Sequence, residues 1–556
     1  MTPNAGPDAT DGVGPPRWVR ASIEVNEGRD PLGLQTTTID RLMPRLLPGI
    51  LELSRRARYF SFYAYLLDLY REQQRPANGT ALSEFIKARE WDYGLAVLNC
   101  PHECGSSPVG AQKLRGVVGQ QEPPYPRGQS VESPFGGFGL YYRTPLSQMG
   151  IVARRGTLLG DTPIGIDVLY QTERARHLAD TFRKAVEDTA YARTWMMRSN
   201  PLPLDVLVEY ANVACLCQLH RRDDERRAVY DAMFGSDPTA PPEVDPESGA
   251  SDREEVMPRA AAVLQRRRSV AHYLTLIEAN PSVPVDNGVY REALWSPPAA
   301  KSAEHALVAG EWAGLVAKDV WQESLCSMWS EFCRRGLDAI RRRDGDGLSW
   351  EETRGLVRAM VSGPPTLDDD TPTTELVHAI AGGTMHLADA LTGDLTVAPL
   401  EDLRSATATL DTGTSGLIVL IELHRRTSGR TDLGWRNAAS LRSAWQPSLA
   451  FVLADLTTHL EASPTVDETL WWVVRTFILG VHERIAYSKL PEHTFRFRWE
   501  DGRVRFYDNG VGRFPLAATR NEPLALLTWD LGFWEREAGG AQLTSQGHAF
   551  INEVFA

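Results

Sequence analysis

The sequence predicts a mainly α, multi-domain helical protein with a short β-hairpin and a winged-helix-like C-terminal segment. Apolar residues recur at helical spacing through most long segments, for example in residues 54–70. Alternating patterns typical of strands are scarce, and the clearest lies in residues 494–507. Two stretches rich in Pro, Asp and Thr or Ser, residues 236–255 and 363–374, interrupt the helical pattern and indicate linkers between domains.

Composition limits the class of protein. The chain has 556 residues, of which 42% are hydrophobic and 24% charged, as in ordinary globular proteins. Its net charge of −13 argues against a general nucleic-acid coat, because uniform attraction to phosphate needs a basic surface. No apolar run approaches the roughly 18 residues of a membrane span, and residues 1–16 lack the apolar core of a signal peptide. We therefore expect no membrane partner and a cytoplasmic protein with reduced cysteines.

The breaks divide the chain into successive parts. We expect a disordered tail at 1–16, an N-terminal helical domain at 17–235, an acidic Pro-rich linker at 236–255, a middle helical domain at 256–362, a second linker at 363–374, and a C-terminal helical domain at 375–556 that carries the hairpin.

The first strong helix covers residues 54–70, where Ser54 is a plausible N-cap and aromatic or aliphatic side chains occur nearly all round. A helix of this kind is expected to be buried. The other helices predicted from the spacing cover residues 178–197, 204–219, 259–278, 311–340, 440–460 and 468–485. Besides the hairpin, strands are expected only at residues 139–142 and 151–159.

The hairpin turns at Asp501-Gly502, a dipeptide that suits the positive φ angles of a two-residue type I′ turn. This turn fixes the register. The predicted pairs are Glu500 with Arg503, Trp499 with Val504, Arg498 with Arg505, and Phe497 with Phe506.

Four arginines are expected on one face of this hairpin: Arg496, Arg498, Arg503 and Arg505. Directly opposed arginines repel each other unless carboxylates or a bound anion lie over them. Two interpretations stay open, a solvated face answered by acidic neighbours and a site for an anion such as a nucleic-acid phosphate.

The C-terminal segment has a helix–hairpin–helix order. Residues 523–531 read as a helix, residues 533–542 as a hairpin that turns at Gly539-Gly540, and Thr544 as the cap of a last helix. This order resembles the end of a winged-helix domain. Because its hairpin carries two glutamates and one arginine, a role in protein docking or packing is favoured over DNA contact.

The six cysteines fall in three close pairs. Cys100 and Cys104 around His102, with Cys215 and Cys217 before His220, could together supply four to six zinc ligands. Neither cluster has the usual C-x-x-C spacing, and Cys215 and Cys217 lie in a helical run, where positions two apart point in different directions. We therefore expect no bound zinc and no cofactor.

No common enzyme motif is found for nucleotides, dinucleotides, zinc peptidases or serine hydrolases. Asp344-Gly345-Asp346 resembles part of a calcium loop, but carboxylates are missing at the required ends. The simpler interpretation is a turn before a helix that Ser349 caps, with Glu352 completing a capping box. We expect no catalytic residues.

Residues 46–70 carry one family resemblance. Leu46-Leu47-Pro48-Gly49-Ile50 is followed by Arg56-Ala57-Arg58-Tyr59-Phe60 and an aromatic helix. This pattern resembles a family of large bacterial proteins, without an assigned activity, that is associated with phage-defence gene neighbourhoods. The resemblance implies a bacterial source and brings no catalytic residue with it.

Together these observations predict a non-catalytic scaffold or sensor subunit of a bacterial, antiphage system. Its expected partners are proteins encoded nearby and DNA or RNA. The expected nucleic-acid or anion-binding residues are Arg55, Arg56, Arg58, Arg496, Arg498, Arg503 and Arg505. The alternative is a divergent metal-dependent nuclease whose acidic residues are scattered along the chain.

Overall fold

The computed structural model describes residues 30–102, 104–118, 127–159, 162–235, 257–342, 347–360, 372–375, 412–490, 493–509 and 519–556. The expected tail at 1–16 and the expected linker at 236–255 lie outside these ranges, as do most of 363–374 and the sequence Asp344-Gly345-Asp346. The described chain is mainly α, with a few short antiparallel strand pairs, which confirms the predicted fold class.

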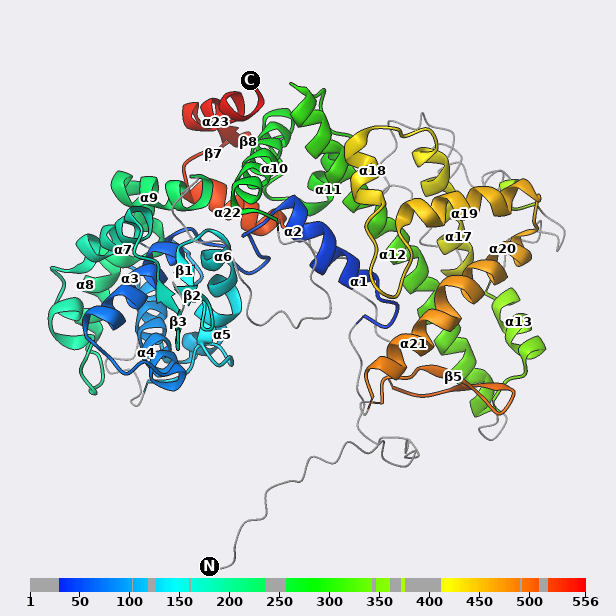
Figure 1. Cartoon of the computed structure of the whole chain (residues 1–556), viewed down its shortest axis with the longest axis horizontal. Coiled ribbons are helices and arrows are strands. Elements are labelled where there is room, and N and C mark those ends of the chain that lie inside the picture. Colours follow the sequence, from blue (N-terminus) through cyan, green and yellow to red (C-terminus); the bar gives the residue numbers. More distant parts are fainter. Residues whose placement is uncertain are drawn as a thin grey trace, which may run out of the picture.

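Figure 1 shows helices α3–α9 gathered at one end of the molecule and α12, α13 and α17–α21 at the other. Helices α10, α11, α22 and α23 lie between these two groups, although α22 and α23 come from the C-terminus. Among the helices that the structure describes, none is both long enough and apolar enough to cross a lipid bilayer.

The N-terminal group is built around α3 (Arg58–Glu72), whose residues Tyr59, Phe60 and Tyr63 are at most 1% exposed. A buried aromatic helix in this segment was predicted. This group also contains α4 (Gly79–Leu98), α5 (Ala111–Leu114), η2 (Arg115–Val117), η3 (Phe138–Tyr142), α6 (Arg143–Gln148), α7 (Glu173–Val186), η4 (Tyr191–Trp195), α8 (Leu204–Ala214), η5 (Leu216–Arg221) and α9 (Asp223–Phe234). The elements that precede α3, namely α1 (Leu34–Thr36), η1 (Thr37–Leu42) and α2 (Met43–Leu46), lie outside this group, and α2 contacts α10 and α12 (Figure 1).

The beginning of α3 differs from the prediction. Ser54 does not cap the helix; its hydroxyl donates to the Tyr141 carbonyl at 2.6 Å. The helix begins at Arg58, and the Ala57 amide donates at 2.9 Å to a carboxylate oxygen of Asp530. A residue near the other end of the chain therefore takes the place of a local cap.

The strand expected at 139–142 is wrong, because residues 138–142 form the π-helix η3. Helical spacing puts the buried rings of Phe138 and Tyr142 on one side, where both approach Tyr63 of α3. This packing overrides the strand propensity of the aromatic residues. Residues 151–159 do contain two short strands, β1 (Val152–Ala153) and β2 (Leu158–Leu159), which pair with β4 (Val168–Leu169) and β3 (Thr162–Pro163).

The middle of the sequence forms the long helix α12 (Ala303–Arg341), together with α10 (Arg259–Ala279), α11 (Asn287–Trp295) and α13 (Trp350–Arg358). Ser349 caps α13 and forms a capping box with Glu352, as predicted. Small residues let α18 approach α12 closely, since a Cβ added at Gly314 would lie 2.5 Å from the Ala438 side chain.

The C-terminal helices pack along α12. They are α17 (Thr412–Thr427), α18 (Leu433–Ala439), α19 (Leu449–Glu461), α20 (Val466–Val473), η7 (Val474–Leu479) and α21 (Gly480–Ser488). The prediction of one helix over 440–460 is wrong for residues 440–448, because α19 begins at Leu449. Pro447 disfavours helical geometry in the residue before it, and Ser448 then caps α19.

The hairpin consists of β5 (Phe497–Glu500) and β6 (Arg503–Phe506), with the four predicted pairs confirmed. Asp501 and Gly502 both have positive φ angles, 52° and 74°. Phe497 and Phe506 are buried against Phe332 of α12, so the apolar face holds the hairpin on the molecule.

The expected order of the C-terminal segment is confirmed by α22 (Asn521–Asp530), β7 (Trp534–Glu537), β8 (Gly540–Leu543) and α23 (Ser545–Phe555), which Thr544 caps. The Ala541 amide donates at 3.0 Å to the Pro281 carbonyl, so this hairpin packs on the loop after α10. The likeness to a winged helix stays a prediction.

Candidate metal centre

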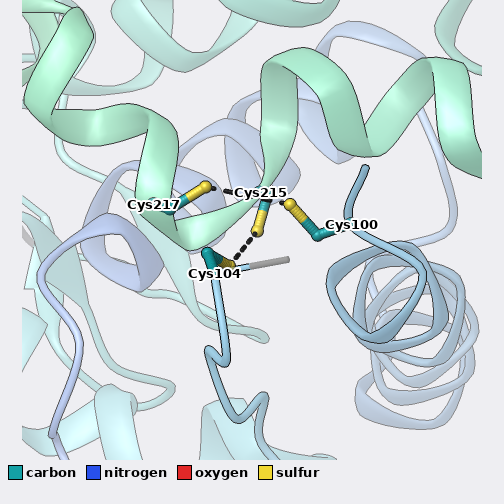
Figure 2. A group of neighbouring side chains, drawn as sticks. All are labelled: Cys100, Cys104, Cys215 and Cys217. Carbon is teal, nitrogen blue, oxygen red and sulfur yellow. Dashed lines mark hydrogen bonds between the residues drawn. The ribbon is translucent and has the colours of Figure 1, made fainter. Parts of the chain in front are cut away.

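Four cysteines from two distant segments of the chain meet beside the first turn of α3. Cys100 and Cys104 follow the C-terminal end of α4, whereas Cys215 and Cys217 lie where α8 passes into η5. Figure 2 shows the four side chains directed toward a common point.

The sulfur atoms have the spacing of a four-coordinate metal site. The Sγ atoms of Cys100 and Cys217 are 3.8 Å apart, those of Cys104 and Cys215 are 3.6 Å apart, and all four lie within 4.8 Å of one another. Zinc bonded to four thiolates at about 2.3 Å separates its ligands by about 3.8 Å in a tetrahedron. The side chains therefore need little movement to surround one ion.

The continuous helical run expected around Cys215 and Cys217 is wrong. Helix α8 ends at Ala214, and Cys215 has φ −56° and ψ 147°, outside the helical region. Cys217 follows in a short 3₁₀-helix. The two side chains are therefore not two positions apart on a continuous α-helix, and both can turn toward the same point.

Three of the four sulfur atoms accept hydrogen bonds from backbone N–H groups in the same loop. The backbone N–H groups of His102, Ser106 and Cys217 interact with the sulfur atoms of the cysteines two residues earlier. The Gln218 amide also lies 3.3 Å from Cys217 Sγ. Donors directed at sulfur favour the thiolate over the thiol, as is common around metal-bound cysteines.

The thiols have different proton affinities. Burial raises the pKa of Cys100 to about 11 and also raises the pKa of the buried Cys215. Burial acts on Cys104 in the same direction, but hydrogen bonds with Ser106, Cys215 and Cys217 together outweigh it and lower the pKa to about 7. Of these three thiols, Cys104 therefore loses its proton most readily to a cation, and a divalent ion would promote deprotonation of the other two.

The neighbouring histidines are not part of this group. Within the described residues, the only cluster of three or more His, Cys, Asp or Glu side chains suited to a metal is Cys100, Cys104, Cys215 and Cys217. The His220 ring packs against Trp529, with ring centroids 4.2 Å apart. Cys326 and Cys333 are buried in α12, as expected for small core residues.

Two of the predicted anion-binding arginines lie inside the protein, next to the cysteines. Arg58 is fully buried; it pairs with Glu225 at 2.8 Å and donates to the Cys215 carbonyl at 2.6 Å. Arg56, 7% exposed, pairs with Asp530 at 2.8 Å and donates to the Ser106 hydroxyl at 3.1 Å. In this conformation, neither guanidinium is open to an external anion.

The remaining predicted arginines do not form one exposed basic face. Arg496 is only 3% exposed, so the expectation that it belongs to an open face is wrong. Arg498 pairs with Glu500, and Arg505 lies 3.3 Å from an Asp501 carboxylate oxygen. Arg503 donates to the Gly347 carbonyl at 2.8 Å, and Arg55 forms an exposed ion pair with Glu522. Acidic side chains therefore neutralise much of the positive charge of these arginines.

Comparisons with protein-family models, with curated proteins and with solved structures find no match to this chain. The likeness of residues 46–70 to defence-associated bacterial proteins therefore stays a prediction.

Proposed function

We propose that the four cysteines hold one zinc ion as a structural centre in a non-catalytic, helical binding protein. The observation that carries this proposal is the group of four sulfur atoms within 4.8 Å of one another. Four thiolates fill a tetrahedral zinc, whereas catalytic zinc keeps a position for water or substrate.

The geometry favours a single ion over the other products of cysteine chemistry. Disulfide bonds have sulfur atoms about 2.05 Å apart, so the pairs at 3.6 and 3.8 Å are thiols. An iron–sulfur cluster also takes four thiolates, but its several iron and sulfide ions would have to fit between them. The space enclosed by these sulfur atoms suits one ion.

The proposed ion connects α4 to the junction of α8 and η5, below the first turn of α3. On one side, the Cys215 carbonyl accepts from Arg58. On the other, Ser106 contacts both Cys104 and Arg56. The ion would thus fix the two loops that position the buried arginines, which is a structural task.

At the level of the cell, we propose a cytoplasmic scaffold or sensor subunit of a bacterial antiphage system that binds proteins encoded nearby. The closed cysteine site and the absence of a carboxylate cluster in the described part of the chain support a non-catalytic role over the nuclease alternative. Binding of DNA or RNA is proposed for the arginines that reach the surface at least in part, namely Arg55, Arg498, Arg503 and Arg505.

The test is metal analysis of protein purified without added metal. We expect about one zinc per chain, lost in the double variant Cys100→Ser/Cys217→Ser, because two neutral hydroxyls replace two thiolate ligands. Cys333→Ser is the matched control, since this buried cysteine lies on α12 outside the group. A parent protein free of zinc, or equal zinc in the double variant, would refute the metal centre.

The non-catalytic role has a separate test. Plasmid DNA incubated with the protein and magnesium should stay intact. Cleavage that a chelator abolishes would favour the nuclease alternative, whatever the zinc content.

A further inference from the structure

A cavity of about 630 Å³ lies where three distant segments of the chain meet. Its walls come from the loop after α2, from the beginning of α11 with the loop before it, and from α22 with β7. Its volume falls in the usual range of small-molecule sites, roughly 300–1,000 Å³. None of the four clustered cysteines lines this cavity.

One part of the wall is aromatic and held in place from outside. Trp534 donates through Nε1 to the Ala525 carbonyl at 3.2 Å, which fixes its ring. Trp529 packs against the His220 ring at 4.2 Å and lies below the Arg56 guanidinium at 5.8 Å. Both tryptophans line the cavity. Rigid aromatic walls suit a planar ring, which can stack on them.

An acceptor without a donor also lines the cavity. Glu52 Oε2 is buried and has no hydrogen-bond partner in the described structure. The nearest cationic atom, Arg520 Nε, is 4.0 Å away, beyond hydrogen-bonding distance. Burial accordingly raises the pKa of Glu52. A carboxylate oxygen in this position is complementary to a ligand N–H group.

The backbone beside this carboxylate is strained. Arg520 has φ 61° and ψ 24°, a left-handed conformation uncommon outside glycine. Its guanidinium donates to the Ile50 carbonyl at 2.7 Å, which keeps the residue at the edge of the cavity. Strain of this kind persists where surrounding contacts enforce it and is frequent at ligand sites.

We propose that this cavity binds a guanine mononucleotide. The base stacks on the tryptophan wall, and the adjacent N1–H and N2–H donors of guanine face the Glu52 carboxylate, which can accept two parallel hydrogen bonds. The phosphate lies toward Arg536, an exposed arginine that also lines the cavity. Adenine lacks this pair of adjacent donors and fits the carboxylate less well.

Calorimetric titration of the full chain with guanosine 5′-monophosphate tests the proposal. We expect saturable binding, at least about tenfold weaker binding of adenosine 5′-monophosphate, and no binding of inorganic phosphate alone. A difference of about tenfold in affinity is a low estimate, because the adenine nucleotide would leave the buried Glu52 oxygen without a hydrogen-bond donor. Failure of the guanine nucleotide to bind, or equal affinity for the adenine nucleotide, would overturn the assignment.

Two variants locate the ligand. Glu52→Gln presents an NH₂ group to the guanine donors, so affinity should fall by roughly 10–100-fold. The melting temperature should change little, because the Glu52 side chain is 36% exposed and its ion pair with Arg520 is long, at 4.0 Å. Arg536→Gln should weaken the nucleotide and leave guanosine unaffected. Arg484→Gln, at an exposed arginine on α21, is the matched control. Unchanged binding in Glu52→Gln would refute this site.

Discussion

Arg58 illustrates how little a charged residue reveals of its own surroundings. Its side chain is 0% exposed and that of Glu225 is 1% exposed, and Ser61 donates to the same carboxylate at 2.7 Å. A pair of this kind is costly to break, because the remaining charge stays buried without a counter-ion.

We predict that Arg58→Met lowers the free energy of unfolding by about 3–5 kcal/mol, the usual cost of leaving one member of a buried pair uncompensated. The double variant Arg58→Met/Glu225→Leu should regain most of this loss. Urea unfolding followed by circular dichroism measures both.

The control for this comparison is Arg227→Met, which breaks an exposed pair with Asp231 and should change the unfolding free energy by less than about 1 kcal/mol. If the single variant at Arg58 is as stable as this control, the buried pair does not form in solution.

At the scale of elements, segments determined by local chemistry could be predicted and segments determined by distant partners could not. The register of β5 and β6 follows from Asp501-Gly502 and from strict alternation, both of which are visible in the sequence. The aromatic character of α3 similarly predicts its burial. The first residue of α3 could not be predicted, because Asp530 caps it from the far end of the chain.

The cysteine site shows the same limit. All four residues could be named as potential ligands, but their meeting depends on a helix end at Ala214 and on contacts across more than a hundred residues. The supporting Ser106 and Gln218 carry no motif at all. The four sulfur atoms can meet because the backbone at Cys215 leaves the helical conformation. The apolar pattern runs through this position without a break, so the sequence gives no sign of the helix end.

The hairpin gives a prediction at this scale. Replacing Arg498 and Arg505 with Gln should change the melting temperature little. Of the ion pairs lost on this hairpin, Arg505–Asp501 is exposed, Arg505–Glu500 is long, at 3.8 Å, and Arg498–Glu500 alone is half-buried. If these arginines contact nucleic-acid phosphates, as proposed, binding should weaken. The slope of log affinity against log salt should become shallower by about 1.8 for duplex DNA, at roughly 0.9 per phosphate.

Fluorescence anisotropy over a salt series provides this measurement, with Arg484→Gln/Arg334→Gln as a charge-matched control on α21 and α12. An unchanged slope in the hairpin variant would show that these arginines do not contact nucleic-acid phosphates. The hairpin would then be a solvated surface or a binding site for an acidic protein.

Across the whole molecule, several buried histidines are held neutral. Burial lowers the pKa of His272 on α10 and of His482 on α21 to about 3 each. The contacts of His482 agree with a neutral ring, because one ring nitrogen accepts from the Arg496 amide at 3.0 Å while the other faces the Pro31 carbonyl at 3.2 Å.

We predict that stability falls as the pH is lowered from about 6.5, the usual histidine value, toward 3. The unfolded chain takes up protons in this window and the folded chain does not, so the full contribution is present above pH 6.5 and is lost on acidification. Two such residues give a limiting slope of roughly 2.7 kcal/mol per pH unit.

Urea midpoints between pH 7.5 and 5 measure this effect above the range where most carboxylates titrate. His482→Asn should reduce the slope, whereas His177→Gln, at an exposed residue on α7, should not. A flat profile in the parent protein would contradict the burial of neutral histidines.

The ion pair between Arg56 and Asp530 can form only late in synthesis, which affects folding on the ribosome. The two residues are 474 positions apart, so at about 5–20 residues per second a ribosome needs roughly 24–95 s after Arg56 to add its partner. During this interval, the aromatic helix that follows Arg56 lacks the carboxylate that completes its first turn. The first core helix of the nascent chain therefore lacks this partner until Asp530 has been synthesised, and chaperones can act on the helix during that time.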